Sequence, residues 1–174
     1  MRRKCSGVLL SFMLITLGTG SATAFDRPTL HEGEMQAGAS QAPATIESRT
    51  MSVRIDRPFA KVYEFLVDPA NWNQWAFGLG KSLRRSNDGW IADSDEGIVK
   101  VRFTPQNQYG VLDHMVTRPW GTQVCVSMRL IANGGGCELL FTLLRGPGMS
   151  DEQYKADANF VQRDLNGLKE LLEK

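Results

Sequence analysis

The chain changes from a strand pattern to a helix pattern within a few residues, and this change restricts its fold more than any other feature. Apolar and polar residues alternate over residues 51–56, the period of two that is typical of a half-buried strand. Over residues 59–66 the apolar residues instead recur about every 3.6 positions, as on one face of a short helix. Pro58 fits the first turn of that helix, where a missing N–H costs nothing. A second short segment follows and carries Trp72 and Trp75.

Alternating runs separated by turn residues occupy the middle of the chain. The clearest turn signals are the Asn-Asp-Gly sequence within residues 86–89 and the glycine-rich residues 133–136. Together with the first strand, the pattern predicts about seven strands, the others lying near residues 83–86, 90–93, 98–104, 109–117, 122–131 and 137–144. Since most connections are tight, the sheet is expected to be antiparallel.

A one-sided apolar stripe marks the last element as a long helix. Its apolar residues recur at steps of four and three over about six turns, and they are Tyr154, Ala158, Val161, Leu165, Leu168 and Leu172. Ser150 and Gln153 form a capping box at the start. The stripe is expected to pack on the sheet, with coiled-coil pairing as the alternative. Gly167 indicates either room for a ligand or a strand crossing, or else a tolerated surface glycine.

This order of elements resembles the SRPBCC superfamily of START-like helix-grip proteins, which includes polyketide cyclase/dehydrase and lipid-transport-like proteins. The resemblance covers nearly all of residues 45–174. It implies an α+β fold in which a curved antiparallel sheet of about seven strands wraps a long C-terminal helix. Two short helices would follow the first strand, and an apolar cavity would lie between sheet and helix. Folds of this kind host binding, transport and catalysis alike, so the resemblance specifies fold and not function.

The first residues are typical of a secretory signal peptide. Three basic residues at 2–4 precede an apolar run at 8–17, and the small-x-small pattern Ala-Thr-Ala lies at 22–24. Residues 1–24 are therefore expected to direct export to the periplasm or the medium and to be removed, with an uncleaved anchor as the alternative. The run is shorter than the about 20 residues of a membrane span, so no stable span is expected after cleavage. Residues 25–44, rich in Gly, Ala, Pro and Ser, predict a flexible linker.

The charge balance argues against nucleic acid as a partner. The chain has 20 basic and 19 acidic residues, and loss of residues 1–24 removes three basic ones, so the formal charge falls from +1 to −2. The basic residues are scattered, and the only adjacent pair after residue 24 is Arg84-Arg85. Electrostatic capture of nucleic acid needs clustered positive charge, which this pattern does not provide.

Cys125 and Cys137 are expected to be free thiols. In the alternating pattern Cys125 shares a face with polar Gln123, whereas Cys137 shares a face with apolar Leu139. Two cysteines on opposite faces of a hairpin do not meet the geometry of a disulfide.

No metal or cofactor site is predicted. The acidic residues at 93–96 lack the spacing of a calcium-binding loop, and His31 falls in the linker without further ligands nearby. The glycine-rich residues 133–136 link two strands and do not open a helix, so they are not expected to hold phosphate.

His114 is the weak candidate for a catalytic residue. It shares strand parity with Leu112 and Val116, so it is expected to point inward, where it would act as a general base or bind a polar head group. The alternative is a core histidine that is hydrogen-bonded to a neighbour or to the backbone. Asp113 lies on the other face, so the two adjacent residues do not form a dyad.

The expected cavity defines the ligand-binding candidates. The aromatic residues after the first helix and at 118–121 would line a ligand entrance, or would anchor the short helices on the sheet, which is the interpretation favoured for Trp75. With His114 and inward-facing residues of strands and helix, the candidates are Trp72, Trp75, Phe103, His114, Trp120, Phe141, Val161 and Leu165.

The sequence and the resemblance together predict an exported protein that binds a hydrophobic or amphipathic small molecule or a lipid. Two alternatives stay open. One is a protein-interaction module of the cell envelope, for which Trp120 would be a contact residue. The other is a polyketide cyclase-like enzyme that uses His114, ranked lower because only one titratable candidate faces the expected cavity.

Overall fold

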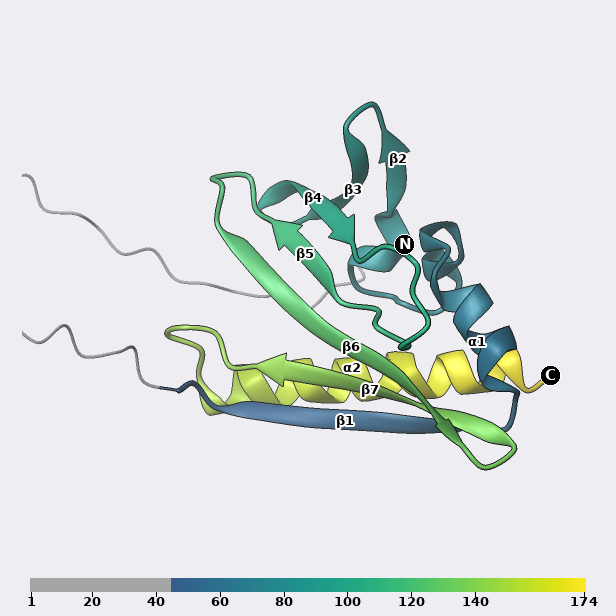
Figure 1. Cartoon of the computed structure of the whole chain (residues 1–174). Coiled ribbons are helices and arrows are strands. Elements are labelled where there is room, and N and C mark those ends of the chain that lie inside the picture. The colour runs from purple at the N-terminus through teal and green to yellow at the C-terminus, as the bar shows by residue number, and fades with distance from the viewer. Residues whose placement is uncertain (1–44) are drawn as a thin grey trace, which may run out of the picture.

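One antiparallel sheet and a 22-residue C-terminal helix dominate residues 45–174, the part of the chain that the computed structural model describes (Figure 1). The strands are β1 (Ser48–Ile55), β2 (Arg84–Ser86), β3 (Gly89–Ser94), β4 (Gly97–Phe103), β5 (His114–Thr117), β6 (Gln123–Asn133) and β7 (Gly136–Leu144). The helices are α1 (Phe59–Leu66), α2 (Asp151–Leu172) and the 3-10 segments η1 (Pro69–Gln74) and η2 (Leu79–Ser82).

The strand order β1-β7-β6-β5-β4-β3-β2 places the first strand beside the last one. The sheet curves, and α2 lies along the side formed by β1 and β7 (Figure 1). The predicted α+β helix-grip architecture is thereby confirmed. The signal peptide and linker expected at 1–24 and 25–44 lie outside the described residues.

The predicted change from strand to helix occurs directly between β1 and α1. Pro58, with a φ of −54°, immediately precedes α1, so its fixed ring angle is already close to the helical one. The buried face of α1 consists of Val62, Tyr63 and Leu66. Asp68 then starts η1 by accepting a hydrogen bond from the Ala70 N–H at 2.9 Å. The chain thus reaches the end of the sheet and turns back without a long loop.

α2 is fastened at both of its ends. At the start, Ser150 Oγ accepts a hydrogen bond from the Gln153 N–H at 3.2 Å, and the Gln153 side chain accepts one from the Ser150 N–H at 2.9 Å, which is the predicted capping box. At the other end, the Arg57 side chain donates to the Leu172 carbonyl oxygen at 2.7 Å. Lys169 also donates to the carbonyl oxygen of Arg54 on β1 at 2.9 Å, so polar contacts as well as the apolar stripe hold the end of the helix against the sheet.

β6 changes its hydrogen-bonding partner halfway along its length. Residues 123–126 pair with β5, whereas residues 127–133 pair with β7. Because β7 stays paired with β1 as far as Leu144, β6 and β7 diverge beyond the pair of Ser127 and Thr142, as Figure 1 shows. The sheet is therefore split at this end.

The strand predicted over 109–117 is wrong in its first half, because β5 begins only at His114. Asn107 imposes a local turn instead: its Oδ1 accepts two backbone N–H groups, at 3.0 and 3.1 Å. Side-chain bonds of this kind compete with the sheet ladder. Gly110 follows with a φ of +68°, and a Cβ added there would lie 2.0 Å from the Leu130 carbonyl oxygen. The backbone approaches β6 so closely that only glycine fits.

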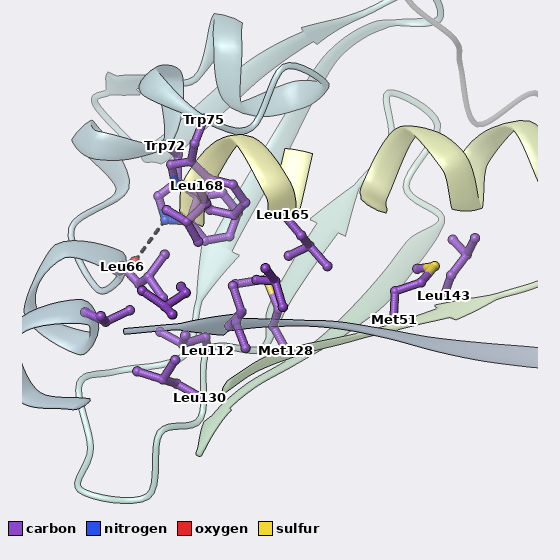
Figure 2. Packing of buried hydrophobic residues seen from close by; sticks show 14 of the residues in the cluster. Met51, Leu66, Trp72, Trp75, Leu112, Met128, Leu130, Leu143, Leu165 and Leu168 are labelled. Carbon is purple, nitrogen blue, oxygen red and sulfur yellow. Dashed lines mark hydrogen bonds between the residues drawn. The ribbon is translucent and has the colours of Figure 1, made fainter. Parts of the chain in front are cut away.

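Two apolar clusters form the core. The larger one joins α1, η1 and α2 to β1, β6 and β7, and Figure 2 shows Trp72, Trp75 and Leu168 gathered within it. The smaller one lies on β3, β4 and β5 and consists of Ala92, Val99, Val101 and Val116. Leu83 and Phe103 pack against both clusters. The two clusters are thus connected at one side of the sheet.

We expect Gly110→Ala to destabilise the fold strongly, because its Cβ would meet a backbone carbonyl in addition to the left-handed strain. Gly134→Ala is the matched control, since Gly134 has a φ of +59° but open space around it. Urea unfolding should show a loss of about 1 kcal/mol for the control and of about 3 kcal/mol or more for Gly110→Ala. Equal losses would show that the Leu130 carbonyl imposes no constraint.

Candidate ligand-binding cavity

A cavity of about 320 Å³ lies between the sheet and α2. Its walls come from β3 to β7, from the η1–η2 segment and from the middle of α2, and they include members of both apolar clusters. Most of the lining residues are apolar or aromatic. A volume above about 300 Å³ with a few polar groups among apolar walls is typical of small-molecule sites.

A wider hollow of about 620 Å³ lies near the starts of β1 and α2, but its central cation is already paired. Arg145 contacts Glu47 at 2.8 Å and Asp151 at 2.6 Å, and it also donates to the Met149 carbonyl oxygen. This hollow is open and its main charges compensate one another. The cavity between the sheet and α2 is therefore the better candidate site.

Seven of the eight residues predicted to bind ligand line this cavity, namely Trp72, Trp75, Phe103, His114, Phe141, Val161 and Leu165. Trp120, the eighth, lies outside it, 56% exposed in the turn between β5 and β6. The Gly121 N–H donates to the Arg118 carbonyl oxygen at 2.9 Å and closes this turn. This turn directs the Trp120 side chain to the protein surface. There the Arg118 guanidinium carbon lies 5.7 Å from the centroid of the Trp120 ring.

Trp72 is the centre of an aromatic wall. Its ring centroid lies 5.3 Å from that of Trp75. It also lies 4.9 Å from the centroids of Phe103 and His114, at interplanar angles of 70° and 89°, an edge-to-face arrangement that aromatic rings prefer. Trp72 Nε1 donates to the Leu66 carbonyl oxygen at 2.9 Å, the dashed line in Figure 2. The indole is thus held in one orientation, and it gives this wall a fixed shape.

His114 is buried and uncharged at neutral pH. It is 8% exposed, and its Nδ1 lies 3.4 Å from the Leu112 carbonyl oxygen, which accepts the hydrogen bond. Burial lowers the pKa of His114 to about 4, so Nε2 keeps a lone pair at pH 7. As predicted, Asp113 lies on the other face, where it accepts from the Met128 N–H at 2.8 Å and pairs with Arg129. His114 can accept a hydrogen bond from a ligand but is a weak base.

Two aspartates of α2 border the cavity, and the sequence reasoning missed both. Asp157 and Asp164 are 8% and 7% exposed. Burial raises the pKa of both carboxyl groups, that of Asp164 to about 6. The spacing contained the signal, because Asp157 follows Tyr154 by three residues and Asp164 precedes Leu168 by four. Both acids therefore fall on the apolar stripe of the helix.

Asp164 also positions the segment that connects η1 and η2. Its Oδ2 accepts a hydrogen bond from the Phe77 N–H at 3.0 Å. Gly167, three residues further along α2, faces the same segment, since a Cβ added there would lie 3.9 Å from the Phe77 ring. That is an ordinary contact distance. Gly167 therefore lies against Phe77 and is not part of the cavity wall.

The diverging ends of β6 and β7 form one side of the cavity. Successive side chains of a strand point to opposite faces, yet consecutive residues at 124–126 and 141–144 all border this space. The strand edges themselves therefore face the cavity. Arg118, 7% exposed, also borders it and lies 3.7 Å from Glu96.

Cys125 and Cys137 are free thiols, as predicted. Cys125 is exposed on β6, whereas Cys137 is buried on β7, where burial raises the pKa of its thiol. No group of three or more potential metal ligands occurs within residues 45–174. Across the same range, none of the helices combines the length and the apolar character needed to cross a membrane.

Comparisons with known proteins bear on the fold. No family model matches the chain, and no curated protein matches its sequence. Among solved structures it is similar to ChR145 from Cytophaga hutchinsonii, with 20% identity, coverage of 75% of this chain and 97% of that one, and a TM-score of 0.55. It is also similar to the Aha1 dimer from Colwellia psychrerythraea, with 15% identity, coverage of 74% and 97%, and a TM-score of 0.55.

A START superfamily protein from Mycobacterium smegmatis is a further structural neighbour. Its identity is 13%, the coverage is 72% of this chain and 97% of that one, and the TM-score is 0.51. The chain therefore has the helix-grip fold that these structures share, as the resemblance of its order of elements implied.

We expect His114 to make stability fall as the pH drops from about 6.5 to about 4. Within this window the unfolded chain binds a proton that the buried ring in the folded state does not. Chemical unfolding at several pH values should show that the free energy of unfolding of the wild type falls by up to about 3 kcal/mol over this range. His114→Phe should not show this decrease. If the free energies of unfolding of the two proteins had the same pH dependence, the pKa of His114 would be close to its usual value in the folded protein.

Proposed function

We propose that this protein binds a small amphipathic molecule in the cavity between the sheet and α2. The observation that carries the proposal is a space of about 320 Å³ whose walls are mostly apolar and whose polar lining includes the buried side chains of His114, Asp157 and Asp164. A ligand that buries about 200 Å² of apolar surface would gain about 5 kcal/mol from that burial. Immobilisation of the ligand offsets part of this gain, so apolar burial of this size corresponds to a Kd of about 1 mM, and tighter binding requires polar contacts with the ligand.

We further propose that the domain works after export. The basic, apolar and small-residue segments of residues 1–24 support this part of the proposal. Residues 25–44 would then separate the cleavage site from the folded domain. An exported carrier of amphipathic molecules would keep its ligand out of water between membranes or between cells.

A second candidate function is proton-transfer catalysis of the cyclase type. One observation favours it: His114 and Asp164, two groups with shifted pKa values, border the same cavity, and such groups gather at catalytic sites. Asp164, with a pKa of about 6, suits a general base near neutral pH better than His114 does. Asp164→Asn that retained full turnover of a cyclase substrate would remove this support. The interaction hypothesis is supported by exposed apolar side chains outside the cavity, among them Trp120 at 56% and Tyr109 at 74% exposure.

We expect Val161→Trp to block the cavity, because Val161 borders it from α2 and an indole there would fill the space of the ligand. Ile131→Trp is the control, since Ile131 is 45% exposed on β6 and does not border the cavity. Calorimetric titration with decanol should give at least about tenfold weaker binding for Val161→Trp than for the control. Equal affinities would place the bound decanol elsewhere.

We expect the full chain, expressed in a host with a secretory pathway, to be recovered outside the cytoplasm with Phe25 as its first residue. Intact-mass measurement of each cell fraction checks this. Leu14→Arg, which places a charge in the apolar run, should keep the protein inside and uncleaved. A full-length wild-type chain in the membrane fraction would instead support the anchor alternative.

A further inference from the structure

Three buried side-chain atoms within residues 45–174 lack a hydrogen-bond partner, and all three belong to residues that line the cavity. They are Trp75 Nε1, Asp157 Oδ2 and Asp164 Oδ1. Buried polar atoms in folded proteins are nearly always paired, because an unpaired one loses its bonds to water without replacement. A molecule held in the cavity would lie beside the residues that carry these atoms.

Asp157 is the less satisfied of the two aspartates. Asp164 accepts one hydrogen bond from the Phe77 N–H at 3.0 Å, whereas none of the side-chain hydrogen bonds within residues 45–174 involves the Asp157 carboxyl group. An ionised carboxylate only accepts, so Asp157 can be satisfied by N–H or O–H donors alone. A cationic donor suits it best, since charge-assisted hydrogen bonds are about twice as strong as neutral ones.

The border of the cavity is predominantly acidic. Its acidic and basic side chains, apart from the imidazole of His114, are Asp93, Asp95, Glu96, Asp157 and Asp164 and the single guanidinium of Arg118. Glu96 lies 3.7 Å from Arg118, and Asp93 lies 2.8 Å from Arg84. The ion pairs within residues 45–174 include neither Asp157 nor Asp164. An anionic ligand would meet like charge at α2, whereas a cation would be attracted there.

We propose that the natural ligand is an amphipathic organic amine whose ammonium group binds Asp157 and whose apolar part lies against the wall formed by Trp72 and Phe103. Seven residues along a helix correspond to a rise of about 10 Å. A second N–H or O–H donor of the same molecule would therefore reach Asp164. This inference rests on the proposed function, because it takes the cavity to be the binding site, and it adds the chemical class of the ligand.

The test compares three probes that share one apolar chain: decylammonium, decanol and decanoate. Each is titrated calorimetrically, below its micelle concentration and at about pH 8, where the amine is cationic and the Asp164 carboxyl group, with a pKa of about 6, is ionised. The proteins are the wild type, Asp157→Asn, Asp164→Asn, Glu170→Gln and the cavity-blocking variant Val161→Trp. Glu170 is an exposed acid on the same helix, so its variant has the same charge change without touching the cavity.

We expect the wild type to bind decylammonium at least tenfold more tightly than decanol, and decanoate least tightly. Asp157→Asn should remove the preference for the amine while leaving decanol binding within twofold. Asp164→Asn should have the smaller effect on a probe with one donor, and Glu170→Gln should behave as the wild type. Asp157→Asn removes an unpaired buried charge, so it is expected to fold, and a thermal melt of each variant checks this.

Different failures are distinguishable. If decanol or decanoate binds as tightly as decylammonium, or if Asp157→Asn keeps the amine preference while Val161→Trp weakens binding, the amine inference is overturned and the cavity remains a binding site. If decylammonium binds Val161→Trp and Glu170→Gln as it binds the wild type but Asp157→Asn also leaves it unchanged, the amine binds outside the cavity. If none of the three probes binds, the proposed function itself fails.

Discussion

The exchange of partners along β6 determines the rest of this structure. An antiparallel strand can hydrogen-bond to a neighbour on each side, but β6 uses β5 over residues 123–126 and β7 over residues 127–133. Since β7 remains with β1 beyond that point, the sheet separates into two wings. A continuous ladder would have closed the space with paired strands. The separation leaves a gap that side chains of α2 and of the η1–η2 segment only partly fill, and the cavity is what remains.

α2 combines two requirements that conflict. Its apolar stripe, including Leu165 and Leu168 at 1% and 0% exposure, holds the helix on the sheet. Asp157 and Asp164 interrupt that stripe at positions where apolar residues would stabilise the fold more. Natural sequences depart from such local consistency mainly at functional sites. The helix therefore carries both fully buried apolar side chains and two of the three unsatisfied buried polar atoms within residues 45–174.

Much of the fold could be predicted from the sequence because periodicity reports burial directly. The strand before Pro58, the helix after it and the stripe of α2 all follow from apolar spacing, and the structure confirms them. The prediction of a strand over 109–117 was wrong in its first half. There the side-chain hydrogen bonds of Asn107 form a local turn, and the backbone at Gly110 approaches the Leu130 carbonyl oxygen closely. Spacing arguments count apolar residues and ignore local polar turns.

The candidate site was only partly predictable for a related reason. His114 and the aromatic candidates after the first helix were found by parity and by composition, whereas Asp157 and Asp164 were not considered. An acid on a helix is normally taken as solvated, and only its register relative to Tyr154 and Leu168 shows otherwise. The position of Trp120 depended on the closure of a short turn, which a period of two does not describe.

Polar contacts hold α2 in place at both of its ends. Arg145 holds the start through Asp151 and the Met149 carbonyl oxygen, and Arg57 holds the finish through the Leu172 carbonyl oxygen. A helix that is held at both ends does not readily move away from the sheet, so α2 is not suited to act as a lid. Molecules would then enter sideways, between the separated edges of β6 and β7. The width of that slot, and not the motion of the helix, would limit the size of what passes.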